Sequence, residues 1–176
     1  MAIVFSNYNV SWDENGNIYC NSINASAGIK LLTSEAVSAA TSGIIETDLF
    51  SYSLPANTLK TDGDFIVYKG SFNSPGDASA IKTLRAYLGS VIFPTHSYTN
   101  SSELDYVMQL TITRINSTTA VFVVELLDNG ASPQILINTP TVADFNTAQT
   151  FKITGQTNNA SYGISNYQSN LTRCTN

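Results

Sequence analysis

The chain has 176 residues, which is enough for one domain with a substantial hydrophobic core. Asp, Glu, Lys and Arg together make up only 12% of it, about half the share that is typical of soluble domains. The net charge of −5 argues against nucleic acid as a partner, because binding phosphates needs clustered Lys and Arg. No segment has the length and apolarity of a membrane span, and residues 1–5 lack the basic start of a signal peptide.

An N-terminal arm is expected over residues 1–42. Residues 7–12 alternate in polarity, and Asn15-Gly16 is a strong hairpin signal, so residues 3–25 are predicted to form a β-hairpin. An isolated hairpin is marginally stable in water, so this one needs a partner, either the main domain or another copy of the chain. We expect oligomer contact or attachment through four of its apolar side chains: Val10, Trp12, Ile18 and Tyr19.

The boundary of the main domain is predicted between residues 26 and 43. The stretch from Thr33 to Gly43 is rich in Ala, Ser and Thr, which is compatible with a short helix or an extended linker. Residues 43–176 then carry about eight strand-like segments separated by turn residues, at spacings typical of a sandwich. The predicted fold is therefore all-β, an antiparallel β-sandwich (jelly roll) preceded by the N-terminal hairpin arm. The expected core includes Leu84, Leu110, Ile112, Val121, Val123 and Phe151.

Residues suited to catalysis are scarce. His96 is the only histidine; it lies in a predicted loop, and no Gly-x-Ser-x-Gly elbow marks a nucleophile. Cys20 and Cys174 are either bridged, which would close nearly the whole chain, or two free thiols, and the second interpretation is favoured because nothing indicates an oxidising compartment. One histidine and two distant cysteines cannot supply a zinc site. We therefore expect no catalytic residue, no metal and no cofactor.

Three pairs of acids with i, i+2 spacing could in principle hydrolyse glycosides. Each pair lies beside Thr, Gly or Ser at the edge of a predicted strand, so solvated turn acids explain all three. The pairs are Glu46 and Asp48, Asp62 and Asp64, and Glu103 and Asp105.

The segment ETDLFSYSLPANTL at residues 46–59 resembles a pattern found in virion structural proteins of tailed bacteriophages. The resemblance continues through DGDF at 62–65, GSF at 70–72 and KTLRAYLG at 82–89, and FKITGQ at 151–156 is similar to the late strand of the same module. It keeps order and spacing over roughly residues 43–156. The resemblance implies a trimeric jelly roll on tail fibres or head exteriors, and it brings no catalytic residues.

The first hypothesis is a homotrimeric capsid decoration or cement protein, assembled in the host cytoplasm, that binds and stabilises the head from the exterior of the virion. The alternative is a tail-fibre tip module that binds a host surface glycan or protein, with Tyr98 as the candidate loop residue. An enzyme such as a glycan depolymerase is the third and least favoured hypothesis. The expected partners are other copies of the chain and major capsid or tail proteins, without nucleic acid and without membrane insertion.

Overall fold

The computed structural model describes residues 10–12, 18–20, 28–35, 39–41, 43–93, 96–128, 134–138 and 144–175. These residues form strands and turns, and they include no helix of the length and apolarity that crossing a membrane requires.

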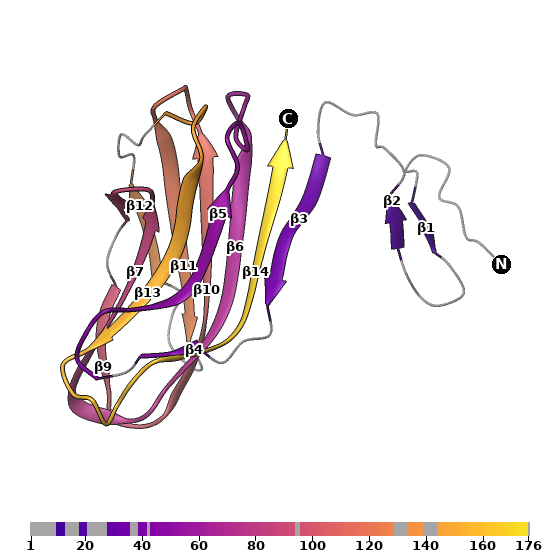
Figure 1. The fold of residues 1–176 in the computed structure, drawn as a ribbon. Coiled ribbons are helices and arrows are strands. Elements are labelled where there is room, and N and C mark those ends of the chain that lie inside the picture. The colour runs from indigo at the N-terminus through magenta and orange to yellow at the C-terminus, as the bar shows by residue number, and fades with distance from the viewer. Residues whose placement is uncertain are drawn as a thin grey trace.

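Two antiparallel sheets face each other (Figure 1). The larger sheet has the order β12-β11-β10-β6-β14-β3, with the short β4 also paired to β14. Its strands are β3 (Gly28–Glu35), β4 (Ala39–Ala40), β6 (Phe65–Ser74), β10 (Leu104–Arg114), β11 (Ala120–Asp128), β12 (Gln134–Asn138) and β14 (Ser165–Thr175). The smaller sheet has the order β5-β13-β7-β8, with β9 also paired to β7. Its strands are β5 (Thr47–Leu54), β7 (Asp77–Leu88), β8 (Val91–Ile92), β9 (His96–Asn100) and β13 (Gln149–Thr157).

The chain crosses repeatedly between the two sheets. It runs from β5 to β6 to β7, returns to the larger sheet for β10, β11 and β12, and ends with β13 in the smaller sheet and β14 in the larger one. The prediction of an all-β antiparallel sandwich is confirmed. One predicted strand, from Ile81 to Phe93, is divided by a turn at Gly89, whose φ of 59° lies in the left-handed region.

The N-terminal residues differ in part from the sequence prediction. β1 (Val10–Trp12) and β2 (Ile18–Cys20) do form an antiparallel hairpin, in which Trp12 pairs with Ile18. The side chains of Val10, Trp12, Ile18 and Tyr19 lie outside the described part of the structure. Of the stretch from Thr33 to Gly43, expected as a short helix or a linker, residues 33–35 belong to β3, which pairs with β14, and Ala39–Ala40 form β4. The strands of the sandwich therefore begin at Gly28 rather than after residue 42.

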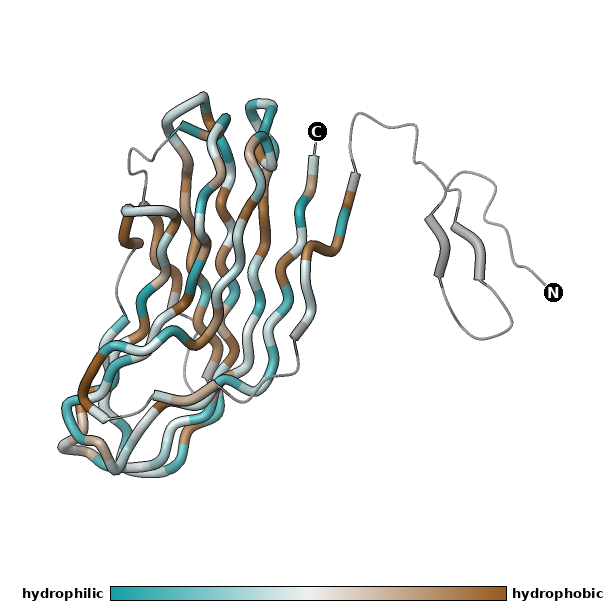
Figure 2. Tube along the Cα trace, in the orientation of Figure 1, coloured by the Kyte–Doolittle hydropathy of each residue, from teal (hydrophilic) through white to brown (hydrophobic). Residues whose placement is uncertain are grey.

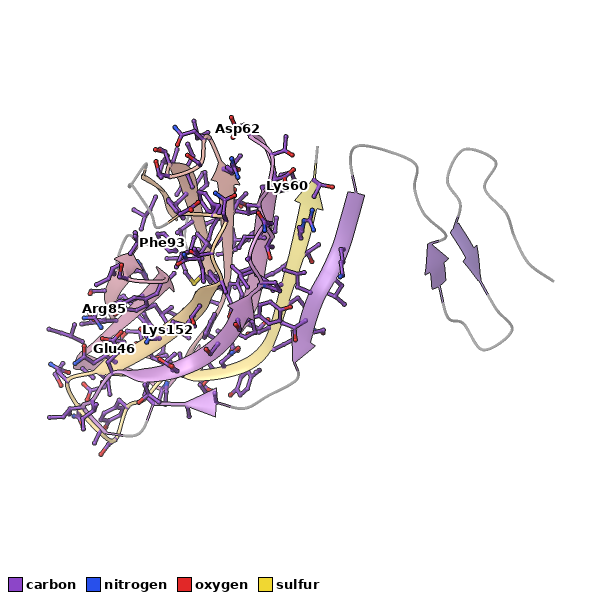
Figure 3. All side chains as sticks on the ribbon, turned by 45° about the horizontal axis from the view of Figure 1, so that its top comes forward. Glu46, Lys60, Asp62, Arg85, Phe93 and Lys152 are labelled. Atoms are coloured by element: carbon purple, nitrogen blue, oxygen red, sulfur yellow. The ribbon has the colours of Figure 1, made fainter. Side chains whose placement is uncertain are left out.

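Strand alternation builds the core between the sheets. On β10 the inward residues Tyr106, Met108, Leu110 and Ile112 are all buried. Phe93, labelled in Figure 3, stacks on Phe122 with 3.9 Å between ring centroids.

The assignment of Val121 and Val123 to the core was wrong. On β11 the buried residues are Ala120, Phe122 and Val124, so the two valines point to the opposite, outer face.

Tyr68 anchors a buried polar contact at the centre of the core. Its hydroxyl shares a 2.8 Å hydrogen bond with the hydroxyl of Ser169, which also accepts a hydrogen bond from the side-chain amide of Asn166. Gly70 makes room for this arrangement, because a Cβ at residue 70 would overlap the Tyr68 hydroxyl. Neighbouring rings of Phe50 and Phe151 lie 5.0 and 5.5 Å from the Tyr68 ring.

Candidate functional site

The outer face of the larger sheet carries an apolar layer that the core does not use. One row of directly paired residues crosses six strands, from β3 to β12. Its members are Leu31, Thr172, Val67, Thr111, Val123 and Ile137. The next row consists of Ile29, Cys174, Phe65, Thr113 and Val121. We call these eleven residues the apolar face.

Within the described part of the chain, nothing covers the ends of this face. Ile29 on β3 is 77% exposed and Ile137 on β12 is 68% exposed, while the residues of the central strands are half-buried between their neighbours. Figure 2 shows apolar residues along each strand of the larger sheet, the edge strand β3 included. A contiguous apolar surface of this kind marks an interaction site more often than isolated exposed side chains do.

A charged row borders the apolar face. Lys69 on β6, Gln109 on β10 and Glu125 on β11 are consecutive in register. Adjacent strands are separated by roughly 4.8 Å, so Lys69 and Glu125 lie about 10 Å apart along the sheet. Neither residue forms an ion pair within the described part of the chain.

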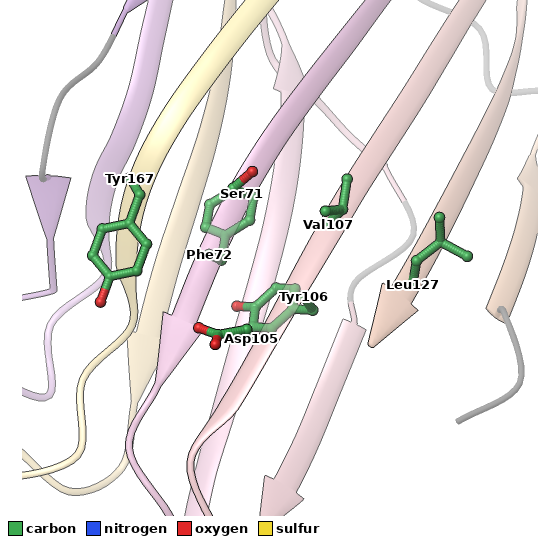
Figure 4. A pocket seen from close by; sticks show the side chains of 7 residues that line it. All are labelled: Ser71, Phe72, Asp105, Tyr106, Val107, Leu127 and Tyr167. Atoms are coloured by element: carbon green, nitrogen blue, oxygen red, sulfur yellow. The ribbon is translucent and has the colours of Figure 1, made fainter. Parts of the chain in front are cut away.

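A shallow hollow of about 530 Å³ lies beyond the charged row, at the far end of the same face. Figure 4 shows the ring of Tyr167 on one side, Ser71, Val107 and Leu127 across the sheet, and Asp105 at the rim. The rings of Phe72 and Tyr106, which stack in the core 5.4 Å apart, belong to the strands beneath it.

Two carboxylates at this end of the sheet are held by one buried amide. The Asn73 side chain is 7% exposed, and its Nδ2 donates to Glu103 Oε1 at 2.7 Å and to Asp105 Oδ1 at 2.9 Å. These acids were predicted to be solvated turn residues. Both are exposed and Glu103 precedes the strand, but Asp105 lies in β10 and both are oriented by Asn73.

The outer face of the smaller sheet is instead closed by a polar network (Figure 3). Glu46 Oε1 accepts hydrogen bonds from the hydroxyls of Tyr87 at 2.6 Å and Thr154 at 2.5 Å, and Glu46 Oε2 lies 3.3 Å from an Arg85 nitrogen. Lys152 forms a 3.1 Å ion pair with Asp48 and sits 4.8 Å from the centre of the Tyr87 ring.

The Glu46 network has an electrostatic consequence. Partial burial acts to raise the pKa of the Glu46 carboxyl, but the hydrogen bonds from Thr154 and Tyr87 and the positive charge of Arg85 outweigh it, so that the pKa is lowered. Burial and the bond to Glu46 raise the pKa of the Tyr87 hydroxyl. Each charged group in this network therefore has a partner of its own chain.

A second hollow, of about 370 Å³, opens at one end of the smaller sheet. It has apolar walls, because Ile44 is 59% and Ile81 is 49% exposed, and a polar floor that includes Thr83 and Gln156. The side-chain amide of Gln156 is already used, since it accepts from Arg85 and donates to the carbonyl of Ile44.

The structure places Tyr98 in strand β9 rather than in a loop. Its hydroxyl donates to the hydroxyl of Tyr106 at 2.8 Å, and burial raises the pKa of Tyr98. His96, also expected in a loop, lies in the same strand and stacks on Tyr98 with 5.2 Å between ring centroids.

The remaining candidates for chemistry are dispersed. Asp64 is buried in its turn, where its carboxylate accepts the backbone N–H groups of Lys60 and Thr61, whereas Asp62 pairs with Arg114 at 3.0 Å. Cys174 is a free thiol whose pKa is raised by partial burial, and the side chain of Cys20 lies outside the described residues. The described residues include no group of three or more His, Cys, Asp or Glu that could hold a metal ion.

Comparisons with known proteins give only distant likenesses. No family model and no curated protein matches the chain. Among solved structures, the lectin UEA-II complexed with galactose is 10% identical at a TM-score of 0.40, over 94% of this chain and 90% of the lectin. The CBM2 module of the evolved Dit of Lactobacillus casei BL23 phage J-1 is 13% identical at a TM-score of 0.30, over 72% of this chain and 69% of the module.

The third comparison is with the structure of the infectious bursal disease virus Gx strain. It is 7% identical at a TM-score of 0.38, over 89% of this chain and 34% of the viral chain. At these scores the likenesses carry no inference about what this chain does.

Proposed function

We propose that this chain is a non-catalytic structural subunit on the exterior of a virus particle, where three copies associate and decorate the head. The observation that carries the association is the apolar face. It spans six strands and displays Val, Ile, Leu, Phe and Thr side chains where a monomeric sandwich would display charges. The virion setting and the number of copies come from the resemblance of roughly residues 43–156 to phage structural proteins.

The charged row supports contact between identical copies. A rotation axis parallel to the strands brings the β6 side of the apolar face in one subunit against the β11 side of the same face in the neighbouring subunit. Because the axis is parallel to the strands, residues of the same row stay at the same height in both subunits. Lys69 then lies opposite Glu125 of the partner subunit, and Val67 lies opposite Val123 of the partner subunit. Both charged groups gain a partner, and apolar side chains meet apolar ones.

The absence of catalysis is part of the same proposal. The only histidine stacks on Tyr98 inside a strand, and the carboxylates of Glu46 and Asp48 are paired with cations of their own sheet. A general acid or base needs a tuned group in reach of a substrate. Assembly needs only complementary surface.

Sedimentation of the purified chain at micromolar concentration tests the proposal, with an expected mass near three times 19.0 kDa. Val67→Asp places a charge in the middle of the apolar face and should give a monomer with an unchanged circular dichroism spectrum. The matched control, Ser51→Asp on the outer face of the smaller sheet, should keep the wild-type mass. A wild-type monomer would refute the assembly, and electron microscopy of antibody-labelled virions that showed no label on the head would refute the location.

A further inference from the structure

We propose that the hollow beside Tyr167 binds an uncharged saccharide. The site lies beyond the apolar face, so the inference goes beyond the assembly proposed above and stands independently of it. Its volume of about 530 Å³ is within the roughly 300–1,000 Å³ of small-molecule sites in proteins. Three features converge there: an exposed aromatic ring, an apolar floor and the oriented carboxylate of Asp105.

The aromatic ring of Tyr167 is exposed by a β-bulge in β14. The pairing of β14 with β6 shifts by one residue between Asn166 and Gln168, and Tyr167 is the residue at the shift. Asn166 holds the bulge from inside, because its buried amide donates to the carbonyl of Leu49 at 3.0 Å and to the Ser169 hydroxyl at 2.8 Å. Bulges commonly redirect a side chain at functional positions. This one leaves Tyr167 51% exposed on the wall of the hollow.

Asp105 supplies directional hydrogen bonding. Asn73 uses one oxygen of Asp105, and a carboxylate has about four acceptor positions, so Asp105 retains capacity for ligand hydroxyls. The orientation of Asp105 is set before a ligand arrives, because Asn73 is itself buried and is also held by Glu103. Preorganised acceptors of this kind reduce the entropic cost of binding.

These features match the chemistry of a sugar ring. A pyranose has a face of C–H groups, which packs on an aromatic ring, and an edge of hydroxyls, which donate to carboxylates. Val107 and Leu127 offer further apolar surface to the C–H face. Because Asp105, the one charged residue among the described residues that line the hollow, is acidic, a uronic or sialic acid would be repelled. The class is therefore an uncharged saccharide.

The site is compatible with assembly through the apolar face. Val67 and Ser71 are four residues apart on β6, which corresponds to about 13 Å along the strand. Because β-sheets twist, two faces that touch at one end diverge toward the other. The hollow then lies at the open end of the contact.

Saturation-transfer NMR and calorimetry on the full chain test the inference, with lactose, cellobiose and maltose as uncharged probes and sialyllactose as the charged one. At least one uncharged disaccharide should bind, and sialyllactose should bind more weakly than lactose. Tyr167→Ala and Asp105→Asn should each weaken the binding by about tenfold or more, whereas Tyr167→Phe, which keeps the ring, should retain it. Ile92→Ala, at a residue of similar exposure on the opposite sheet, is the control and should have no effect.

Three outcomes would overturn the inference: no binding of any uncharged probe, binding that neither Tyr167→Ala nor Asp105→Asn reduces, or equal binding of sialyllactose. Asp105 is exposed on the strand surface, so Asp105→Asn tests the site even if replacing Tyr167 disturbs the bulge. The sedimentation mass of each variant separates the two proposals, because loss of saccharide binding should leave assembly unchanged.

Discussion

The outer faces of the two sheets have opposite designs. On the smaller sheet, the row Asp48, Thr154 and Arg85 is polar throughout, and its charged groups are tied into hydrogen bonds and ion pairs within the chain. On the larger sheet, the row that includes Val67 and Val123 carries only Leu, Val, Ile and Thr side chains from one edge to the other. One face pairs its charges within the chain, and for the other, which exposes apolar side chains, we propose that another copy covers it.

This difference shows that the charged residues are distributed unevenly over the molecule. Although they make up 12% of the chain, they are not spread equally over the two outer faces. The paired ions concentrate on the outer face of the smaller sheet, and the charged pair of the larger sheet, Lys69 and Glu125, stands apart within one chain.

The largest effect is expected from removing the edge of the larger sheet. Deleting residues 1–40 takes away β3 and β4, which leaves β14 as an uncovered edge and removes the partly buried Leu32 from the core. We expect a loss of about 3 kcal/mol or more in the free energy of unfolding. Deleting residues 1–27 keeps β3 and should retain a cooperative melt close to that of the full chain. Urea unfolding of the two truncations distinguishes them, and equal stability would show that β3 contributes little.

A charge reversal at the border of the apolar face should give the next largest effect. Lys69→Glu places like charges opposite each other between subunits and should weaken association by about 10- to 100-fold. Adding Glu125→Lys restores opposite charges and should recover most of the affinity. Lys152→Glu on the smaller sheet is the control and should leave the mass unchanged. If sedimentation shows that the double variant associates as weakly as Lys69→Glu alone, Lys69 does not lie opposite Glu125 of the partner subunit.

The smallest effect concerns the polar network of the smaller sheet. Because the folded pKa of Glu46 is lower than its ordinary value of 4.5, its contribution to stability is present above about pH 4.5 and is lost as the pH falls below it. Glu46→Gln should therefore be less stable than wild type near neutral pH, by under about 1 kcal/mol because the group is partly exposed, and the difference should shrink in acid. Urea unfolding on either side of pH 4.5 measures this, and a difference that grew in acid would contradict the network.

Most strands could be predicted because their boundaries carry local signals. Gly, Pro and Asn separate β5, β6, β7, β10 and β11, and a period of two within them identifies the sandwich. β3 (Gly28–Glu35) was missed because it runs directly into a stretch rich in Ala, Ser and Thr that lacks strong strand character, and because its pairing with β14 joins the two ends of the sandwich. Contacts so distant in sequence leave no local pattern.

The candidate site was harder to predict than the fold. Residues 120–124 are apolar at every position, which hides which side faces the core, and Val121 and Val123 were assigned to it wrongly. Apolar residues on both sides of a strand are typical of a strand that is covered on both faces, and this pattern could have indicated the apolar face. The hollow carried no such signal, because Tyr167 reaches its position through a bulge that only the pairing of β14 with β6 defines.

If another copy covers the outer face of the larger sheet, it shields thiols on that face from alkylation. The alkylation rate of a single cysteine, in a background with Cys20→Ser and Cys174→Ser, measures this shielding. Val123→Cys places the thiol within the apolar face, and Ser51→Cys places it on the outer face of the smaller sheet. The account predicts that Val123→Cys is protected in the assembled protein and reacts freely when Val67→Asp is added, whereas Ser51→Cys reacts equally in both. Equal reactivity of Val123→Cys in both backgrounds would contradict it.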